Sequence, residues 1–364
     1  MNLRGFLLVP AGAAMLAGLD AALQMLDLPA PVATDRLPQV HGMLMVLAFV
    51  GTLISLERAV ALRRRAALAA PALLGTGGLL LLSPAPLVCG RIALVLGAAA
   101  LVGVYVPLWR RQRDDAVLVQ ALGAVLATGA AALWLGGVAM PLLVPWLVGF
   151  VVLTIGGKRL ELARIAMGPA AGSTLVLLSS MIAAAVGLAL LVPRAGSVLL
   201  GVALLALTGW LARHDVARHT VRGDGAARFM ALGMLGGYFW LAVAAGTWLL
   251  GGPATSGARY DAVLHAVFLG FTISMVMAHA PVILPAVLRR PLPYRPHLLA
   301  PLALLHASLV VRVWWGDALG STLAWRAGAA INVAALLGFV GVAAWAATRG
   351  AARPPQRVAR EVAA

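Results

Sequence analysis

The chain has 364 residues, of which 62% are hydrophobic and 11% are charged. Soluble globular proteins use about 45–50% apolar and about 25% charged residues, so this composition excludes a soluble domain and predicts an all-α, multi-pass membrane protein. The formal net charge of +16 would suggest nucleic-acid binding in a soluble protein. Here the basic residues stand in short clusters between apolar runs of about 20 residues, the length that spans a bilayer, so we expect no nucleic-acid partner.

In chain order, the apolar runs predict twelve transmembrane helices. They lie near residues 6–25, 41–61, 67–83, 92–109, 116–136, 141–157, 171–192, 196–212, 229–250, 260–284, 298–315 and 326–347. With these spans, 22 of the 28 Lys and Arg residues fall on the side of both termini, and the other 6 are Arg36, Arg91, Arg194, Arg259, Arg312 and Arg326. Cytoplasmic connections carry the excess of Lys and Arg, so both termini are expected in the cytoplasm of a bacterial-type inner membrane.

Two domains follow from this layout. Residues 1–348 form one twelve-helix transmembrane domain, and residues 349–364 form a short basic cytoplasmic tail. The first span begins with Arg4 and small residues as a signal peptide does, but we interpret it as an uncleaved helix. Cys89 is the single cysteine, which excludes an intramolecular disulfide and a thiolate cluster within one chain.

Charged clusters end the second, sixth and tenth spans, in "LERAVALRRR", "KRLELARI" and "AVLRRPLPYR". These spans stand four apart, as three four-helix units around a pseudo-threefold axis would, although the positive-inside tendency alone also places arginines there. Within the clusters, Glu57 with Arg58, and Glu161 with Lys158, Arg159 and Arg164, are expected to form local ion pairs at helix ends. Asp20 either joins a proton path or lies near the outer face.

Two histidines near the outer face form the first candidate site. His41 begins the second span and His265 lies a few residues into the tenth, each within about two turns of the outer face. Histidines within a membrane are costly, and two neutral imidazoles on facing helices are what a six-coordinate haem requires. The alternative is that each imidazole binds only a backbone carbonyl. His214, His219 and His297 are set aside as interfacial.

A second pair lies deeper. His279 follows His265 by fourteen residues and is about 21 Å further in, on nearly the same face of the helix. His306 enters from the cytoplasmic side on the next span and reaches a similar depth. His279 and His306 would then hold a second haem or a copper ion, or would hydrogen-bond to each other and join neighbouring helices.

Two motifs resemble the catalytic subunit of haem-copper oxidases. "HGMLMVLAF" from His41 is similar to the stretch of helix 2 that supplies a ligand to the low-spin haem, and "RYDAVLHAVFLGFTISM" is similar to helix 10. The resemblance implies a twelve-helix bundle in which helices 2, 6 and 10 line three pores, with haem b held by His41 and His265.

Departures from that family remove its reaction centre. The sequence has no histidine between His41 and His214, and the tenth span lacks a His-x-His pattern, so the copper ligands and the second haem ligand are missing. "LHAVFLGFTISMVMAHAPVILPAVL" is also similar to a late helix of the NnrS family, haem- and copper-containing membrane proteins linked to nitric-oxide stress. That resemblance implies metal binding without oxidase activity.

Other polar residues fit a haem without requiring one. Arg312, Arg36 and Arg259 lie at the depth of the first site, where guanidinium groups would pair with haem propionates. Arginines at a membrane interface also extend to the headgroups without any cofactor. Trp314, Trp315 and Trp325 are expected to form an aromatic belt at the outer interface.

The sequence therefore predicts a haem-binding membrane protein for electron transfer or nitric-oxide handling, with a quinol or a cytochrome as redox partner; whether it is an enzyme stays open. The main alternative is a twelve-helix transporter, because "GTLISLERAVALRRR" resembles the loop motif of the major facilitator family. Against it, the connection between the sixth and seventh spans is short, and few polar residues besides Thr272, Ser274 and Asn332 lie near the midplane. A scaffold or assembly factor is the third reading.

Overall fold

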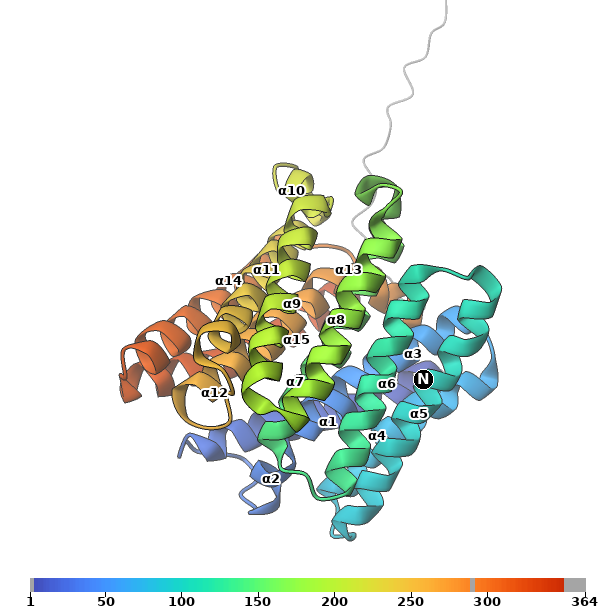
Figure 1. Cartoon of the computed structure of the whole chain (residues 1–364). Coiled ribbons are helices and arrows are strands. Elements are labelled where there is room, and N and C mark those ends of the chain that lie inside the picture. Colours follow the sequence, from blue (N-terminus) through green and yellow to red (C-terminus); the bar gives the residue numbers. More distant parts are fainter. Residues whose placement is uncertain (1–2, 289–291, 350–364) are drawn as a thin grey trace, which may run out of the picture.

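The computed structural model describes residues 3–288 and 292–349. Within that part, the chain has no strand, and twelve helical spans are long and apolar enough to cross a membrane, as predicted (Figure 1). Arg289, Arg290 and the tail beyond Arg349 lie outside the described residues.

Most spans are single helices, and four are composite. The single helices are α1 (Leu3–Met25), α5 (Leu87–Gln112), α6 (Asp115–Leu135), α7 (Met140–Met167), α8 (Ala171–Leu191), α9 (Pro193–His214), α11 (Gly225–Gly251) and α15 (Thr322–Thr348). The second span joins α2 (Arg36–Met43), η1 (Leu44–Gly51) and α3 (Thr52–Leu62), and the third joins η2 (Arg65–Leu68) and α4 (Ala69–Leu82). The tenth joins α12 (Gly257–His265), η3 (Ala266–Ile273) and α13 (Ser274–Leu288), and the eleventh joins η4 (Pro296–Leu298), α14 (Leu299–Leu309) and η5 (Val310–Ala318). A short helix, α10 (Ala217–Thr220), lies between α9 and α11.

Short connections with defined turn chemistry join the helices. Arg113 adopts the left-handed conformation and ends α5, and the next residue, Asp114, caps α6 by accepting a hydrogen bond of 2.8 Å from the amide of Ala116. Only Val192 separates α8 from α9, and Pro193 is the first residue of α9, a position where a helix needs no backbone N–H.

The second, sixth and tenth spans form the centre of the bundle. In the most apolar window of each, 72%, 67% and 61% of the residues are buried, against at most 56% in any other described span. η3 packs on α7, and α13 packs on α3. The remaining helices surround this centre, so side chains from these three spans have the least contact with lipid.

Helix packing in the described chain repeats every four spans. The first span packs on the third (α1 on α4), the fifth on the seventh (α6 on α8), and the ninth on the eleventh (α11 on α14). α5 packs on α6 and α9 on α11, which joins the fourth span to the fifth and the eighth to the ninth; α15 contacts α1 and closes the ring.

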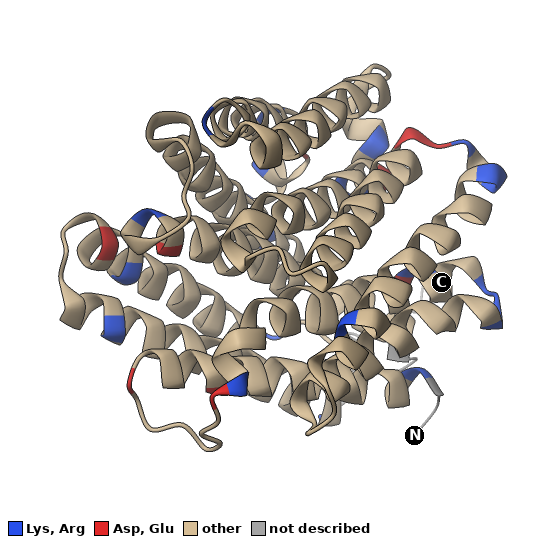
Figure 2. Cartoon of the chain, turned by 60° about the horizontal axis from the view of Figure 1, so that its bottom comes forward, with Lys and Arg blue, Asp and Glu red and all other residues tan. Residues whose placement is uncertain are grey.

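Small residues allow the close approach that such packing needs. At Gly201 in α9, a Cβ atom would lie 2.6 Å from the backbone nitrogen of Leu249 in α11. A larger residue there would separate the two helices. Charged residues lie mainly towards the ends of the helices (Figure 2).

Candidate functional site

An outer cavity of about 460 Å³ lies between the first, second, tenth, eleventh and twelfth spans. His41, His265 and Arg312 are in its wall, together with apolar side chains such as Met45 and Phe268. Its volume falls within the range of about 300–1,000 Å³ that small-molecule and cofactor sites occupy.

The His41 ring is fixed by the neighbouring helix α1. Its Nδ1 lies 2.9 Å from the carbonyl oxygen of Gly18. A carbonyl only accepts hydrogen bonds, so Nδ1 carries the proton and the neutral ring keeps the lone pair of Nε2. A glycine is needed at position 18, because a Cβ there would collide with the side chain of Met45.

The His265 ring is fixed from within its own helix. Its Nδ1 lies 2.8 Å from the carbonyl oxygen of Asp261 and 3.3 Å from that residue's carboxylate. In the described part of the chain, neither His41 nor His265 has a hydrogen-bond partner on Nε2. The two rings line one cavity. A metal-binding histidine has this arrangement, with one nitrogen held by a carbonyl or carboxylate and the other free.

Arg312 forms a planar, two-bond pair with Asp261. Its Nε and Nη2 donate hydrogen bonds of 2.8 and 2.7 Å to the carboxylate, and its guanidinium lies 5.4 Å from the ring centre of Trp325. Asp261 thus joins Arg312 to His265, a role that sequence reasoning missed although the Asp stands four residues before the His. Of the three tryptophans predicted to form an aromatic belt, Trp325 lines this cavity, whereas Trp314 and Trp315 are exposed.

Arg36 and Arg259 lie apart from this cavity. The Arg36 guanidinium donates hydrogen bonds of 2.8 and 2.7 Å to the carbonyls of Leu81, in the last turn of α4, and Ala85, beyond its end, and Arg259 donates to the carbonyl of Gly251. Arg36 is the first residue of α2, and Arg259 lies in the first turn of α12. Of the three arginines predicted to pair with haem propionates, Arg312 is therefore the one that lines the cavity.

Three π-helical segments surround the outer cavity. η1 begins three residues after His41, η3 begins directly after His265, and η5 contains Arg312. π-helical turns are rare and often occur at functional sites, since the wider turn costs stability and re-aims the side chains next to it. Because three such segments surround one cavity, we infer that a function of this cavity, and not helix packing alone, explains them.

An inner cavity of about 400 Å³ lies below the first. Val50, Thr272, Ile273 and Leu336 line both cavities, so the two meet at these residues. Its opposite end reaches His279 and the charged residues of α7.

His279 binds Arg159, and not His306. Its Nδ1 lies 2.8 Å from the carbonyl of Met275, so its Nε2 accepts the hydrogen bond of 3.0 Å from Arg159. Arg159 also donates to both carboxylate oxygens of Asp215, at 2.7 and 2.8 Å, and Tyr238 donates to the same carboxylate. Burial disfavours the charged form of Asp215, but the hydrogen bonds and charge of Arg159 hold its pKa below the ordinary value.

His306 has both ring nitrogens engaged. Trp240 donates to its Nδ1 at 2.9 Å, and its Nε2 lies 3.3 Å from the hydroxyl of Ser274. Among the described residues no hydrogen bond joins His306 to His279, and no group of three or more His, Cys, Asp or Glu residues could hold a metal ion. The arrangement favours hydrogen-bonding roles for both residues of the second predicted pair.

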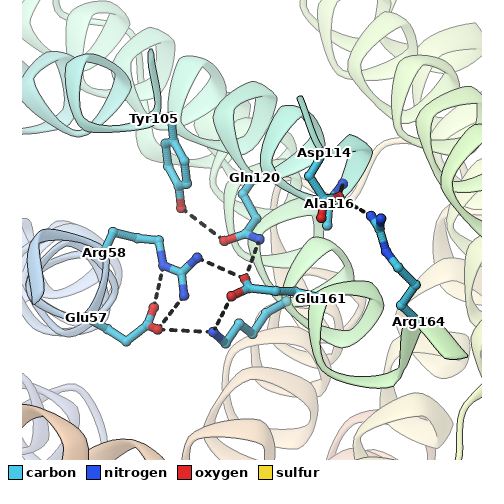
Figure 3. A network of polar contacts seen from close by, with 9 residues as sticks. Glu57, Arg58, Tyr105, Asp114, Ala116, Gln120, Glu161 and Arg164 are labelled. Atoms are coloured by element: carbon cyan, nitrogen blue, oxygen red, sulfur yellow. Dashed lines mark hydrogen bonds and ion pairs between the residues drawn. The ribbon is translucent and has the colours of Figure 1, made fainter. Parts of the chain in front are cut away.

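The charged clusters join different spans, and not only neighbours in one helix (Figure 3). As predicted, Arg58 pairs with Glu57 and Lys158 with Glu161. Arg58 also reaches Glu161 at 2.9 Å, and Lys158 reaches Glu57 at 3.1 Å, which ties the second span to the sixth. The predicted local pairing of Arg159 and Arg164 is wrong, because the carboxylates nearest to them, Asp215 and Asp114, come from other parts of the chain.

Asp20 lies in the C-terminal half of α1, close to the connection between the first and second spans. Its carboxylate accepts a hydrogen bond from the amide of Val32, in the connection between the first and second spans.

One family model matches residues 4–348, from the start of α1 to the end of α15, and its description is "Domain of unknown function (DUF8744)". The chain belongs to the DUF8744 family. The match includes every described span and both cavities. No curated protein matches the sequence.

Proposed function

We propose that this DUF8744 protein binds a b-type haem in the outer cavity, with His41 and His265 as the axial ligands, and that it transfers electrons within the membrane. The observation that carries the proposal is the state of the two imidazoles: each Nδ1 is held by a carbonyl, and each Nε2 is without a described partner in the wall of one cavity. Neutral imidazoles held in this way are ready to bind a metal.

The surroundings fit a haem. Apolar side chains form most of the cavity wall, as the porphyrin requires, and Arg312 supplies a cation at the depth where propionates would lie. Asp261 already binds Arg312, so the propionates would share this arginine with the carboxylate. A bound haem would supply one-electron redox chemistry. Two histidine ligands would fill both axial positions, which favours electron transfer over nitric-oxide binding.

We further propose that the bundle is of the haem-copper oxidase type, with a pseudo-threefold arrangement. The central position of the second, sixth and tenth spans and the packing that repeats every four spans support this. Cytoplasmic termini in a bacterial-type inner membrane belong to the same proposal.

The test is the absorbance spectrum of protein purified from haem-replete cells. We expect a Soret band and, after reduction, the sharp alpha band of a bis-histidine haem. His41→Ala and His265→Ala should each remove this spectrum, because one imidazole cannot hold a six-coordinate haem alone. His219→Ala, in the short helix α10, is the control and should keep it. A colourless, metal-free wild-type preparation would refute the proposal.

A transporter is the second candidate, because the two cavities meet at shared residues and together reach from the outer to the inner half of the bundle. The same spectra separate the candidates, since a transporter of this kind needs no haem. Colourless protein that carries a solute across vesicle membranes would favour the transporter.

A further inference from the structure

The inner cavity takes no part in holding the proposed haem. Apolar residues of α1, the second span, α13 and α15 form most of its wall, and Lys158, Arg159 and His279 lie at its inner end. Val340, which is 44% exposed, is also in the wall, so the cavity reaches the lipid-facing surface of α15. A molecule dissolved in the bilayer could therefore enter from the side.

The charges at the inner end are balanced among the described residues. Arg58 and Lys158 face the carboxylates of Glu57 and Glu161, and Arg159 faces Asp215. His279 accepts a hydrogen bond from Arg159 on Nε2, so its ring is neutral. An anionic headgroup in an apolar cavity needs a cation that has no other partner. A phospholipid phosphate or a fatty-acid carboxylate is therefore a poor match, and an uncharged headgroup is a good one.

Two hydrogen-bond donors at the cavity remain available. The first is the hydroxyl of Thr272, which lies in the shared wall, is buried and has no partner in the described chain, so a ligand oxygen that accepts from it would satisfy a buried polar group. The hydroxyl of Thr154 also has no described partner but faces α6, because a Cβ at Gly123 would lie 2.9 Å from its oxygen. Lys158 has three N–H donors, of which Glu57 and Glu161 take two.

We propose that the inner cavity binds a membrane quinone or its quinol. This class of molecule combines a neutral ring, two ring oxygens that form hydrogen bonds, and a long apolar tail. The ring oxygens would accept hydrogen bonds from Thr272 and Lys158, and the tail would follow the apolar wall towards α15. Thr272 and Ile273 line both cavities, so this site adjoins the outer cavity.

The experiment measures quinone binding directly, without using the haem. The full chain is purified in lipid nanodiscs, the co-purified quinone is extracted and quantified, and binding of a short-tailed benzoquinone is titrated. Gly12→Leu should fill the cavity, because Gly12 lines it and a Cβ there meets no atom within 4 Å. Gly187→Leu in α8 is the matched control, since a Cβ there is equally free and lies away from the cavity.

We expect about one quinone per chain, at least tenfold weaker binding in Gly12→Leu and in Thr272→Val, and unchanged binding in Gly187→Leu. Equal binding by wild type and Gly12→Leu, or recovery of phospholipid as the sole extracted ligand, would overturn the proposal. Colourless protein that binds quinone in this way would refute the haem and leave the quinone site standing. A haem spectrum without quinone binding would refute the quinone site and leave the haem proposal standing.

Discussion

At the residue scale, the hydrogen bonds of each imidazole distinguish the histidines from one another. His41 and His265 each use only Nδ1, whereas His306 uses both ring nitrogens and His279 receives Arg159 on Nε2. A nitrogen that already accepts a hydrogen bond has no lone pair left for a metal. The sequence predicted two histidine pairs by depth alone, and depth does not show which nitrogen has a partner.

Asp261 should tune the proposed haem through His265. Replacing Asp261 with Asn removes a negative charge beside this ligand, so the oxidised, more positive iron loses stabilisation and the reduction potential should rise. A tenfold change in the relative affinity for the two oxidation states corresponds to about 59 mV, and we expect a rise of about that size. Redox titration of the alpha band measures it. Asp27→Asn, at an ion pair whose carboxylate is 81% exposed, should leave the potential unchanged.

Arg159 should contribute more to stability than any surface ion pair. Arg159→Met leaves Asp215, which is fully buried, without its partner, and breaking a buried pair in this way costs about 3–5 kcal/mol. Arg164→Met breaks the pair with Asp114 at an arginine that is 52% exposed, where the cost is at most about 1 kcal/mol. Thermal unfolding in detergent should show a large fall in Tm for the first variant alone. Similar Tm values would contradict the assigned role of Asp215.

At the element scale, the composite spans shape the outer cavity. The apolar pattern predicted the second, tenth and eleventh spans but not their π-helical segments. In an almost wholly apolar run, one extra residue in a turn does not change the sequence pattern. The extra residue matters in space, since it turns the side chains that follow it relative to those before it. His41, His265 and Arg312 all lie within or beside such segments.

The contact between η5 and α15 depends on Gly328. A Cβ at this position would lie 2.7 Å from the backbone nitrogen of Arg312 and 2.8 Å from the carbonyl oxygen of Ser308. Gly328→Leu should therefore push α15 away from η5 and lower the unfolding free energy by about 1–3 kcal/mol. Gly341→Leu, in the same helix with open space around its Cβ, should change it little. Chemical denaturation of the two variants in detergent would measure the difference, and equal stability would show that α15 is not held this closely.

At the scale of the whole molecule, the orientation in the membrane can be tested with the natural cysteine. Cys89 is exposed and lies near the start of α5, which the charge distribution places outside. A membrane-impermeant maleimide should label Cys89 in right-side-out vesicles. In a Cys89→Ser background, Arg113→Cys, at the other end of α5, should be labelled only in inverted vesicles. The reverse pattern would place both termini outside.

The sequence by itself determined the class of protein, the number of spans and the bias of basic residues to one face. These properties depend on the free-energy cost of placing polar groups in lipid, and that cost belongs to each residue whatever its neighbours are. Only the tertiary structure decided which polar groups meet. Arg159 binds Asp215 from 56 positions away, Trp240 donates a hydrogen bond to Nδ1 of His306, and Arg36 binds a carbonyl in the last turn of α4. Such partners come from the packing of separate helices, and helices of similar apolar composition give no sign in sequence of which faces will touch. The sequence predicted His41 and His265 as a pair from their depth alone. The fold shows in addition that both rings line one cavity and that a hydrogen bond on Nδ1 fixes the orientation of each ring.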